Sequence, residues 1–125
     1  MIKKGLSLKQ LNNLLKKWQS KLLLKDWKLS VKIVDFKRKD FRQSGDIKVY
    51  LNKKKAVILL SQNPFKNEEE TIVHELIHLI LWDFDHFCEK IILKTNKPFS
   101  SNHNKYLDKL EKKIEQLTQI LAKNK

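Results

Sequence analysis

Cysteine and long apolar runs are scarce in this chain of 125 residues, and each shortage excludes a class of protein. The single cysteine, Cys88, has no partner for an internal disulfide or a thiolate metal cluster, so a half-buried structural thiol is expected. Residues 1–10 include lysines but lack the apolar run of a signal peptide, and no apolar stretch approaches membrane-spanning length. We therefore expect a cytoplasmic protein with a single domain over residues 1–125.

Arginine is also scarce, which qualifies the strongly basic character of the chain. The formal net charge of +13 suggests a polyanionic partner. Only Arg38 and Arg42 are arginines, and lysine enrichment alongside many Ile and Asn residues is also what an AT-rich genome produces. Because arginine is the residue that reads bases and grips phosphate bidentately, sequence-specific recognition is disfavoured. Non-specific contact with nucleic acid through the lysines stays open.

One motif stands out in residues 71–81, which read Thr-Ile-Val-His-Glu-Leu-Ile-His-Leu-Ile-Leu. His74 and His78 are four residues apart, close to one helical turn, so both imidazoles project from one helix face and can share a metal ion. Glu75 lies beside them as the expected general base. This is the HExxH pattern of zinc hydrolases, and its chance expectation in a chain of this composition is roughly 0.007 matches.

The alternative is a buried amphipathic helix whose histidines are ordinary core groups. Two His and one Glu on an apolar helix would each need a polar partner, and one metal ion supplies a partner for all of them. The metal site is therefore the favoured interpretation.

Periodicity along the chain predicts an α+β fold. The expected order is an N-terminal helix, a small three-stranded and mainly antiparallel sheet, the HExxH helix, and a C-terminal helix that supplies the third metal ligand. A capping box at Ser7 opens the first helix, and Pro64 ends the strand pattern. The expected bounds are helix 7–24, strands 27–34, 47–51 and 56–60 with a hairpin turn at 52–55, helix 67–83, a short apolar piece at 91–93, and a last helix from about 102.

A catalytic zinc site usually has three protein ligands, so one more ligand is needed. On a helical wheel of the last helix, His103 and Glu111 both face the apolar stripe, and Glu115 lies at its margin. Glu111 is favoured because a carboxylate on a core-facing stripe needs a partner. Asp83, Asp85 and His86 are candidates for orienting an imidazole or binding a transition-state oxygen, although a surface loop that closes the helix is the favoured interpretation of these three residues. Tyr106, and His103 if it is not a ligand, are the candidate donors for oxyanion stabilisation.

The motif and the last helix resemble two families of zincin-type HExxH metallopeptidases. In SprT/Spartan-like proteases a His at the start of a late helix completes the site, which implies His103, although Asn104 replaces the Gly that follows it there. In small gluzincin-like peptidases of phages and mobile elements a later helix supplies a Glu, and residues 110–118 resemble that helix and imply Glu111. A metzincin is excluded, because Leu81 and Phe84 occupy its Gly and third-ligand positions.

We therefore expect a zinc-dependent metallopeptidase that acts on a peptide or protein. His74, His78 and Glu111 would bind Zn²⁺, and Glu75 would take a proton from the metal-activated water. The strand at 56–60 is expected to pair with an extended substrate. Two alternatives remain, namely a zinc-stabilised, non-catalytic module that binds nucleic acid or a protein partner, and a latent peptidase blocked by its first helix or by the tail at 122–125.

Overall fold

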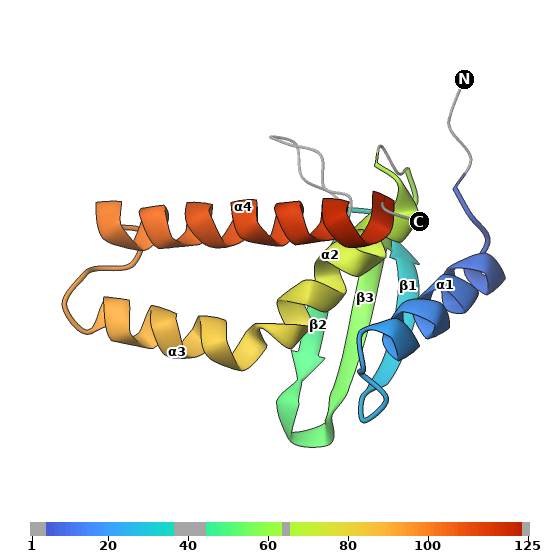
Figure 1. The fold of residues 1–125 in the computed structure, drawn as a ribbon, viewed down its shortest axis with the longest axis horizontal. Coiled ribbons are helices and arrows are strands. Elements are labelled where there is room, and N and C mark those ends of the chain that lie inside the picture. Colours follow the sequence, from blue (N-terminus) through green and yellow to red (C-terminus); the bar gives the residue numbers. More distant parts are fainter. Residues whose placement is uncertain (1–4, 37–44, 64–65, 124–125) are drawn as a thin grey trace. The chain divides into compact units, whose positions relative to one another are not determined.

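The computed structural model describes residues 5–36, 45–63 and 66–123 and has the predicted α+β class. Figure 1 shows the order of its elements, with an N-terminal helix, a sheet, and three further helices. The chain divides into two compact units, residues 1–76 and 77–125. The expectations placed on Pro64, Arg38 and Arg42 lie outside the described residues.

Helix α1 (Leu8–Lys21) opens the first unit and begins with the predicted capping box. The Ser7 hydroxyl accepts from the Gln10 backbone N–H, and the Gln10 side chain accepts from the Ser7 N–H. The buried side of the helix consists of Leu11, Leu15 and Trp18. It ends three residues earlier than the sequence indicated, and the chain turns through Leu23 at a positive φ of 59°.

The sheet has three strands in the order β1-β3-β2, formed by β1 (Lys28–Val34), β2 (Gly45–Tyr50) and β3 (Lys55–Ser61). β3 pairs parallel with β1 and antiparallel with β2, so the sheet is mixed, and the antiparallel expectation holds for one of its two pairings. The turn between β2 and β3 contains a short 3₁₀ helix, η1 (Leu51–Lys53), followed by Lys54 in the left-handed region. Because β3 is paired on both sides, the expectation that it binds substrate backbone is wrong.

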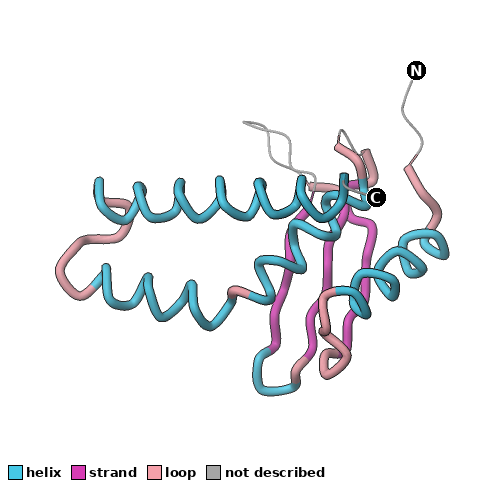
Figure 2. Tube along the Cα trace, in the orientation of Figure 1, coloured by secondary structure: helices cyan, strands magenta, loops and turns pink. Residues whose placement is uncertain are grey.

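One face of the sheet carries the core of the first unit. Ala56, Ile58 and Leu60 of β3 are almost completely buried, and Val31 of β1 lies in register with Ile58. Helices α1 and α2 (Glu68–Ile80) cover this face. The Glu69 carboxylate of α2 accepts hydrogen bonds from two α1 side chains, the Lys17 ammonium group and the Trp18 indole N–H. The tube in Figure 2 shows the sheet with these two helices.

The second unit contains two helices that run antiparallel, α3 (Trp82–Leu93) and α4 (Ser101–Lys123) (Figures 1 and 2). α3 was not expected from the sequence, which indicated only a short apolar piece near its end. α2 ends at Ile80, and α3 begins after the single residue Leu81, which explains why the predicted helix 67–83 was too long. The last turn of α2 belongs to this unit. Among the described residues, no helix has the length and apolar character needed to cross a membrane.

Candidate metal centre

Helix α2 places the residues of the HExxH motif. Its start is fixed by Asn67, whose side-chain oxygen accepts from the Glu70 N–H at 3.1 Å and whose backbone carbonyl accepts from the Thr71 hydroxyl at 3.1 Å. Acidic residues occupy the first turn, as the helix dipole favours. Ile72, Val73 and Leu76 are completely buried, so hydrophobic packing fixes the rotation of the helix about its axis. The remaining side of α2 carries both histidines, which are only partly buried.

Helix α4 contributes a carboxylate to the second histidine. Nε2 of His78 lies 3.3 Å from Oε2 of Glu111, and their side chains are 24% and 54% exposed. Two ligands bound to one zinc ion at about 2.0–2.2 Å, at the tetrahedral angle, are separated by about 3.4 Å. The observed separation therefore fits two ligand atoms on one metal ion. The helical wheel placed Glu111 toward the core, whereas the structure leaves about half of its side chain exposed.

The first histidine completes the group, since an unbroken helix carries both His74 and His78. The ligand atoms of His74, His78 and Glu111 all lie within 4.8 Å of one another. Two imidazoles and one carboxylate form the donor set of several catalytic zinc sites. Glu75, the residue after the first histidine, is buried with 8% of its surface exposed. A carboxylate in that position has the chemistry needed for proton transfer.

His103, the alternative third ligand, has a different environment. It is buried at 4% exposure, where Nδ1 accepts from the Phe99 N–H at 2.8 Å and Nε2 lies 2.8 Å from Oε2 of Glu89. Because Nδ1 accepts, Nε2 carries the proton and donates to the carboxylate. Both nitrogens are thus used, Nε2 in joining α4 to α3 and Nδ1 in holding the loop that precedes α4, and His103 is not in the group with His74 and His78. Sequence reasoning missed this role because nothing in the spacing pairs it with Glu89.

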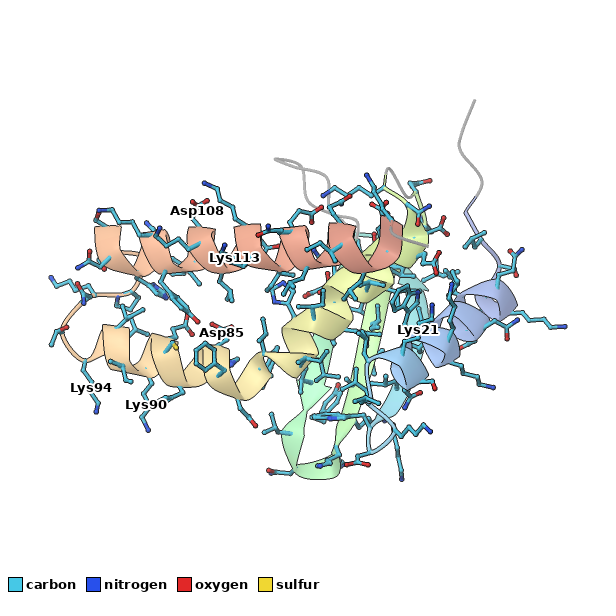
Figure 3. All side chains as sticks on the ribbon, viewed as in Figure 1. Lys21, Asp85, Lys90, Lys94, Asp108 and Lys113 are labelled. Atoms are coloured by element: carbon cyan, nitrogen blue, oxygen red, sulfur yellow. The ribbon has the colours of Figure 1, made fainter. Side chains whose placement is uncertain are left out.

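Asp85, His86 and Tyr106 make polar contacts within α3 or between α3 and α4. The Tyr106 hydroxyl donates to Oδ1 of Asp85 at 2.6 Å, and Figure 3 shows Asp85 between the two helices. Burial and then this hydrogen bond raise the pKa of Tyr106 well above its usual range. Nδ1 of His86 lies 2.8 Å from the carbonyl oxygen of Trp82, and Asp83 is exposed. Tyr106, Asp85 and His86 therefore have helix partners that account for their positions.

Comparisons with protein-family models, with curated proteins and with solved structures find no match for this chain. A functional conclusion must therefore come from its own residues and their geometry.

Proposed function

We propose that the chain is a zinc-dependent peptidase in which His74, His78 and Glu111 bind the metal ion. One observation carries the proposal, namely that Glu111 on α4 lies next to the HExxH histidines, within the 4.8 Å that encloses the three ligand atoms. The motif predicts a third ligand without naming it, and the helical position of Glu111 in the sequence independently favours this residue. The type of donor and the separation of the atoms both suit zinc.

The chain's own residues then have distinct roles. The bound zinc would supply the Lewis acidity that activates water and polarises the scissile carbonyl. The Glu75 carboxylate would take a proton from the attacking water and deliver it to the leaving amine. Its burial favours this role, because a carboxylate with little access to solvent interacts more strongly with nearby charge.

Strand β2 is the proposed site for the substrate backbone. Within the described residues β2 is an edge strand of the sheet, and an edge strand is where an extended peptide can add as a further strand. Gly45 at the start of β2 lies against Thr71 of α2, one helical turn before His74. This close approach keeps the strand beside the helix that carries the motif.

Metal content is the first test. We expect about one zinc per chain in the wild type by elemental analysis after dialysis, and strongly reduced zinc in His78→Ala and in Glu111→Ala. Glu115→Ala, which removes a carboxylate one turn further along α4, is the matched control and should keep its zinc. Equal zinc in wild type, His78→Ala and Glu111→Ala would exclude the site.

Activity is the second test, and Glu75→Gln separates the base from the ligands. This variant should retain zinc but hydrolyse a quenched fluorescent peptide library about 10²- to 10⁴-fold more slowly, because the amide cannot accept the proton. Full activity in Glu75→Gln would exclude Glu75 as the base even if zinc binding had been established.

Two other functions have less support. A purely structural zinc site normally has four protein ligands, whereas the group found in the described part of the chain has three. For the latent peptidase blocked by α1, the contacts seen are two hydrogen bonds from α1 to Glu69 in the first turn of α2, away from the histidines of the motif. The end of the tail, residues 124–125, lies outside the described residues. The unpaired Cys88 is in keeping with the reducing, cytoplasmic setting that we propose.

A further inference from the structure

The face of the sheet opposite α1 and α2 has a different composition from the covered face. Side chains alternate across a strand, so residues in register with one another point to the same side. On the side of the sheet away from the helices, the register places one residue each of β1, β3 and β2 side by side in three rows. These rows are Lys28-Lys55-Tyr50, Ser30-Val57-Lys48 and Lys32-Leu59-Asp46. All of the lysines in these rows are exposed. With Lys53 of η1, which is also exposed, they form what we call the lysine face (Lys28, Lys32, Lys48, Lys53 and Lys55).

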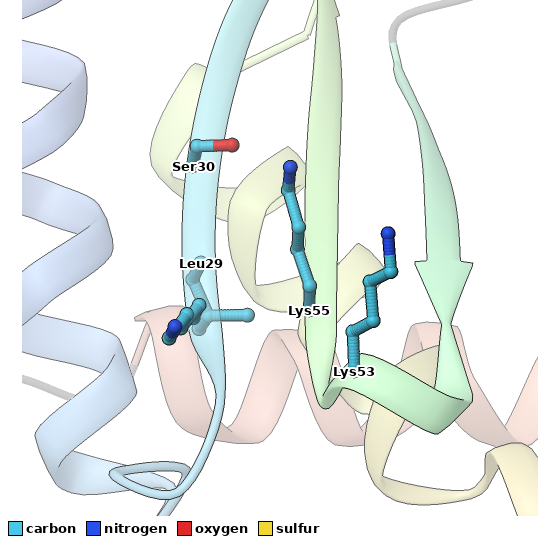
Figure 4. Close-up of a pocket in the computed structure, with 5 residues that line it drawn as sticks. Leu29, Ser30, Lys53 and Lys55 are labelled. Atoms are coloured by element: carbon cyan, nitrogen blue, oxygen red, sulfur yellow. The ribbon is translucent and has the colours of Figure 1, made fainter.

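The lysine face is hollowed near the β2–β3 turn. A depression of about 350 Å³ is lined by Lys28, Leu29, Ser30, Lys53 and Lys55, with no carboxylate among these residues. Figure 4 shows Lys53 and Lys55 extending along the strands on this side of the sheet, with the Ser30 hydroxyl nearby. Ammonium groups and a hydroxyl are donors to phosphate oxygens. The depression therefore suits a phosphate group.

An exposed aromatic ring lies in the same row as two of these lysines. Tyr50 is 47% exposed, and Nζ of Lys55 lies 5.8 Å from its ring centroid. The sole acidic residue of the three rows, Asp46, has its carboxylate engaged with the backbone N–H of Ile47. A positively charged surface that also offers an aromatic ring to stack on is the combination used to bind single strands without sequence preference.

We propose that the lysine face binds single-stranded nucleic acid non-specifically, with phosphates at Lys28, Lys53 and Lys55 and one base stacked on Tyr50. A duplex would use the lysines but has no unstacked base for Tyr50. The absence of arginine from this face agrees with binding that does not read sequence. The proposal does not depend on the metal ion, since the face is on the other side of the sheet from α2.

Salt dependence gives the size of the expected effect. Neutralising Z phosphates of a single strand gives a slope of about −0.7Z in log K against log salt concentration. Three to five lysines therefore predict a slope of about −2 to −3.5. Removing two lysines from the face should reduce the magnitude of that slope by about 1.4.

The experiment measures fluorescence anisotropy of a labelled oligothymidylate of about 20 nucleotides, a length that exceeds common site sizes. The chain of 125 residues is titrated between 50 and 200 mM KCl. The variant Lys28→Gln/Lys55→Gln should bind more weakly with a shallower slope. Its matched control, Lys9→Gln/Lys16→Gln, removes the same charge from exposed positions on α1 and should bind almost like the wild type. Equal losses in the two double variants would overturn the proposal, because net charge alone would then explain binding.

The second arm tests the aromatic ring. Tyr50→Ala should weaken oligothymidylate binding about tenfold with an unchanged salt slope, while Tyr50→Phe should bind like the wild type because its ring still stacks. Far-ultraviolet circular dichroism checks that each variant is folded. Oligouridylate should bind comparably. A duplex that binds more tightly than the single strand, or polyglutamate that displaces the oligonucleotide at equal charge concentration, would contradict the proposal.

Discussion

Gly45 is the residue at which strand β2 and helix α2 come closest. A Cβ built at this position would lie 2.6 Å from Cγ2 of Thr71 and 3.1 Å from the Leu59 carbonyl oxygen. The first distance is shorter than real Cβ contacts allow, so a larger residue would move either the strand or the helix that carries the motif. Glycine is needed at position 45 because it has no side chain, and not because its backbone adopts a positive φ.

Gly45→Ala is accordingly expected to destabilise the fold by about 1–3 kcal/mol through overpacking. Thr71→Ser removes the clashing methyl group and keeps the hydroxyl that donates to the Asn67 carbonyl, so it should reduce the cost of the alanine. Urea unfolding of the wild type, both single variants and the double variant gives the coupling between the two sites. Additive losses would show that the strand and helix do not meet as described.

Among the elements, the α3–α4 pair is joined by polar contacts that the hydrophobic pattern did not reveal. His103 bonds to Glu89 and to the Phe99 backbone, and Tyr106 bonds to Asp85. α3 itself has no buried residue, and Phe84 and Phe87 are more than half exposed. These hydrogen bonds therefore matter more for holding α3 than they would for a helix with a large apolar contact.

Replacing His103 should separate its structural role from metal binding. His103→Ala removes two hydrogen bonds from a buried position and is expected to cost about 2–4 kcal/mol of unfolding free energy. Its zinc content should equal that of the wild type, measured under conditions where the variant is folded. Zinc lost from His103→Ala but kept by Glu111→Ala would reverse the assignment of the third ligand.

Tyr106 gives the α3–α4 pair a dependence on alkaline pH. Its pKa is raised in the folded chain, so the neutral form is favoured there, whereas the unfolded chain ionises near the ordinary value of about 10. The stabilisation is thus complete below about pH 10 and is lost as the pH rises above it. The unfolding free energy of the wild type should fall more steeply from pH 9 to 11 than that of Tyr106→Phe, and parallel curves would contradict this.

The elements with one-sided apolar patterns were predictable from the sequence. The Leu11, Leu15 and Trp18 stripe gave α1, and the alternation in β1 and β2 gave the two edge strands. α3 was missed because its large apolar residues are exposed rather than gathered on a buried side. The parallel pairing of β1 with β3 could not be deduced, because the alternation that identifies a strand does not specify its partner or direction.

Part of the metal site was also predictable from the sequence pattern. The spacing of His74 and His78 follows from helical geometry alone, and that part of the group required no tertiary information. The choice between Glu111 and His103 depends on which of them contacts His78 and which contacts Glu89, and the sequence pattern does not specify these contacts. Both residues were expected to face inward, and the pairing of His103 with Glu89 appears only when the helices are placed side by side.

For the molecule as a whole, metal binding is expected to contribute to stability as well as to chemistry. A ligand that binds only the folded state at a hundred times its Kd stabilises it by about 2.7 kcal/mol. Treatment with EDTA should therefore lower the midpoint of thermal unfolding by several degrees, and added zinc should restore it. Glu111→Ala should show little response to either reagent. An equal response in wild type and Glu111→Ala would mean that the ion acts elsewhere.

The parallel pairing of β1 with β3 has a consequence for the order in which the chain folds. β2 and β3 can form a hairpin locally, because Tyr50 and Lys55 pair across a short turn, whereas Lys28 must find Lys55 from much earlier in the chain. During synthesis, β1 leaves the ribosome before its only partner strand in the described sheet has been made. The backbone groups of β1 then remain without their strand partner until residue 61 has emerged, and this waiting period is when the nascent chain is most exposed to aggregation.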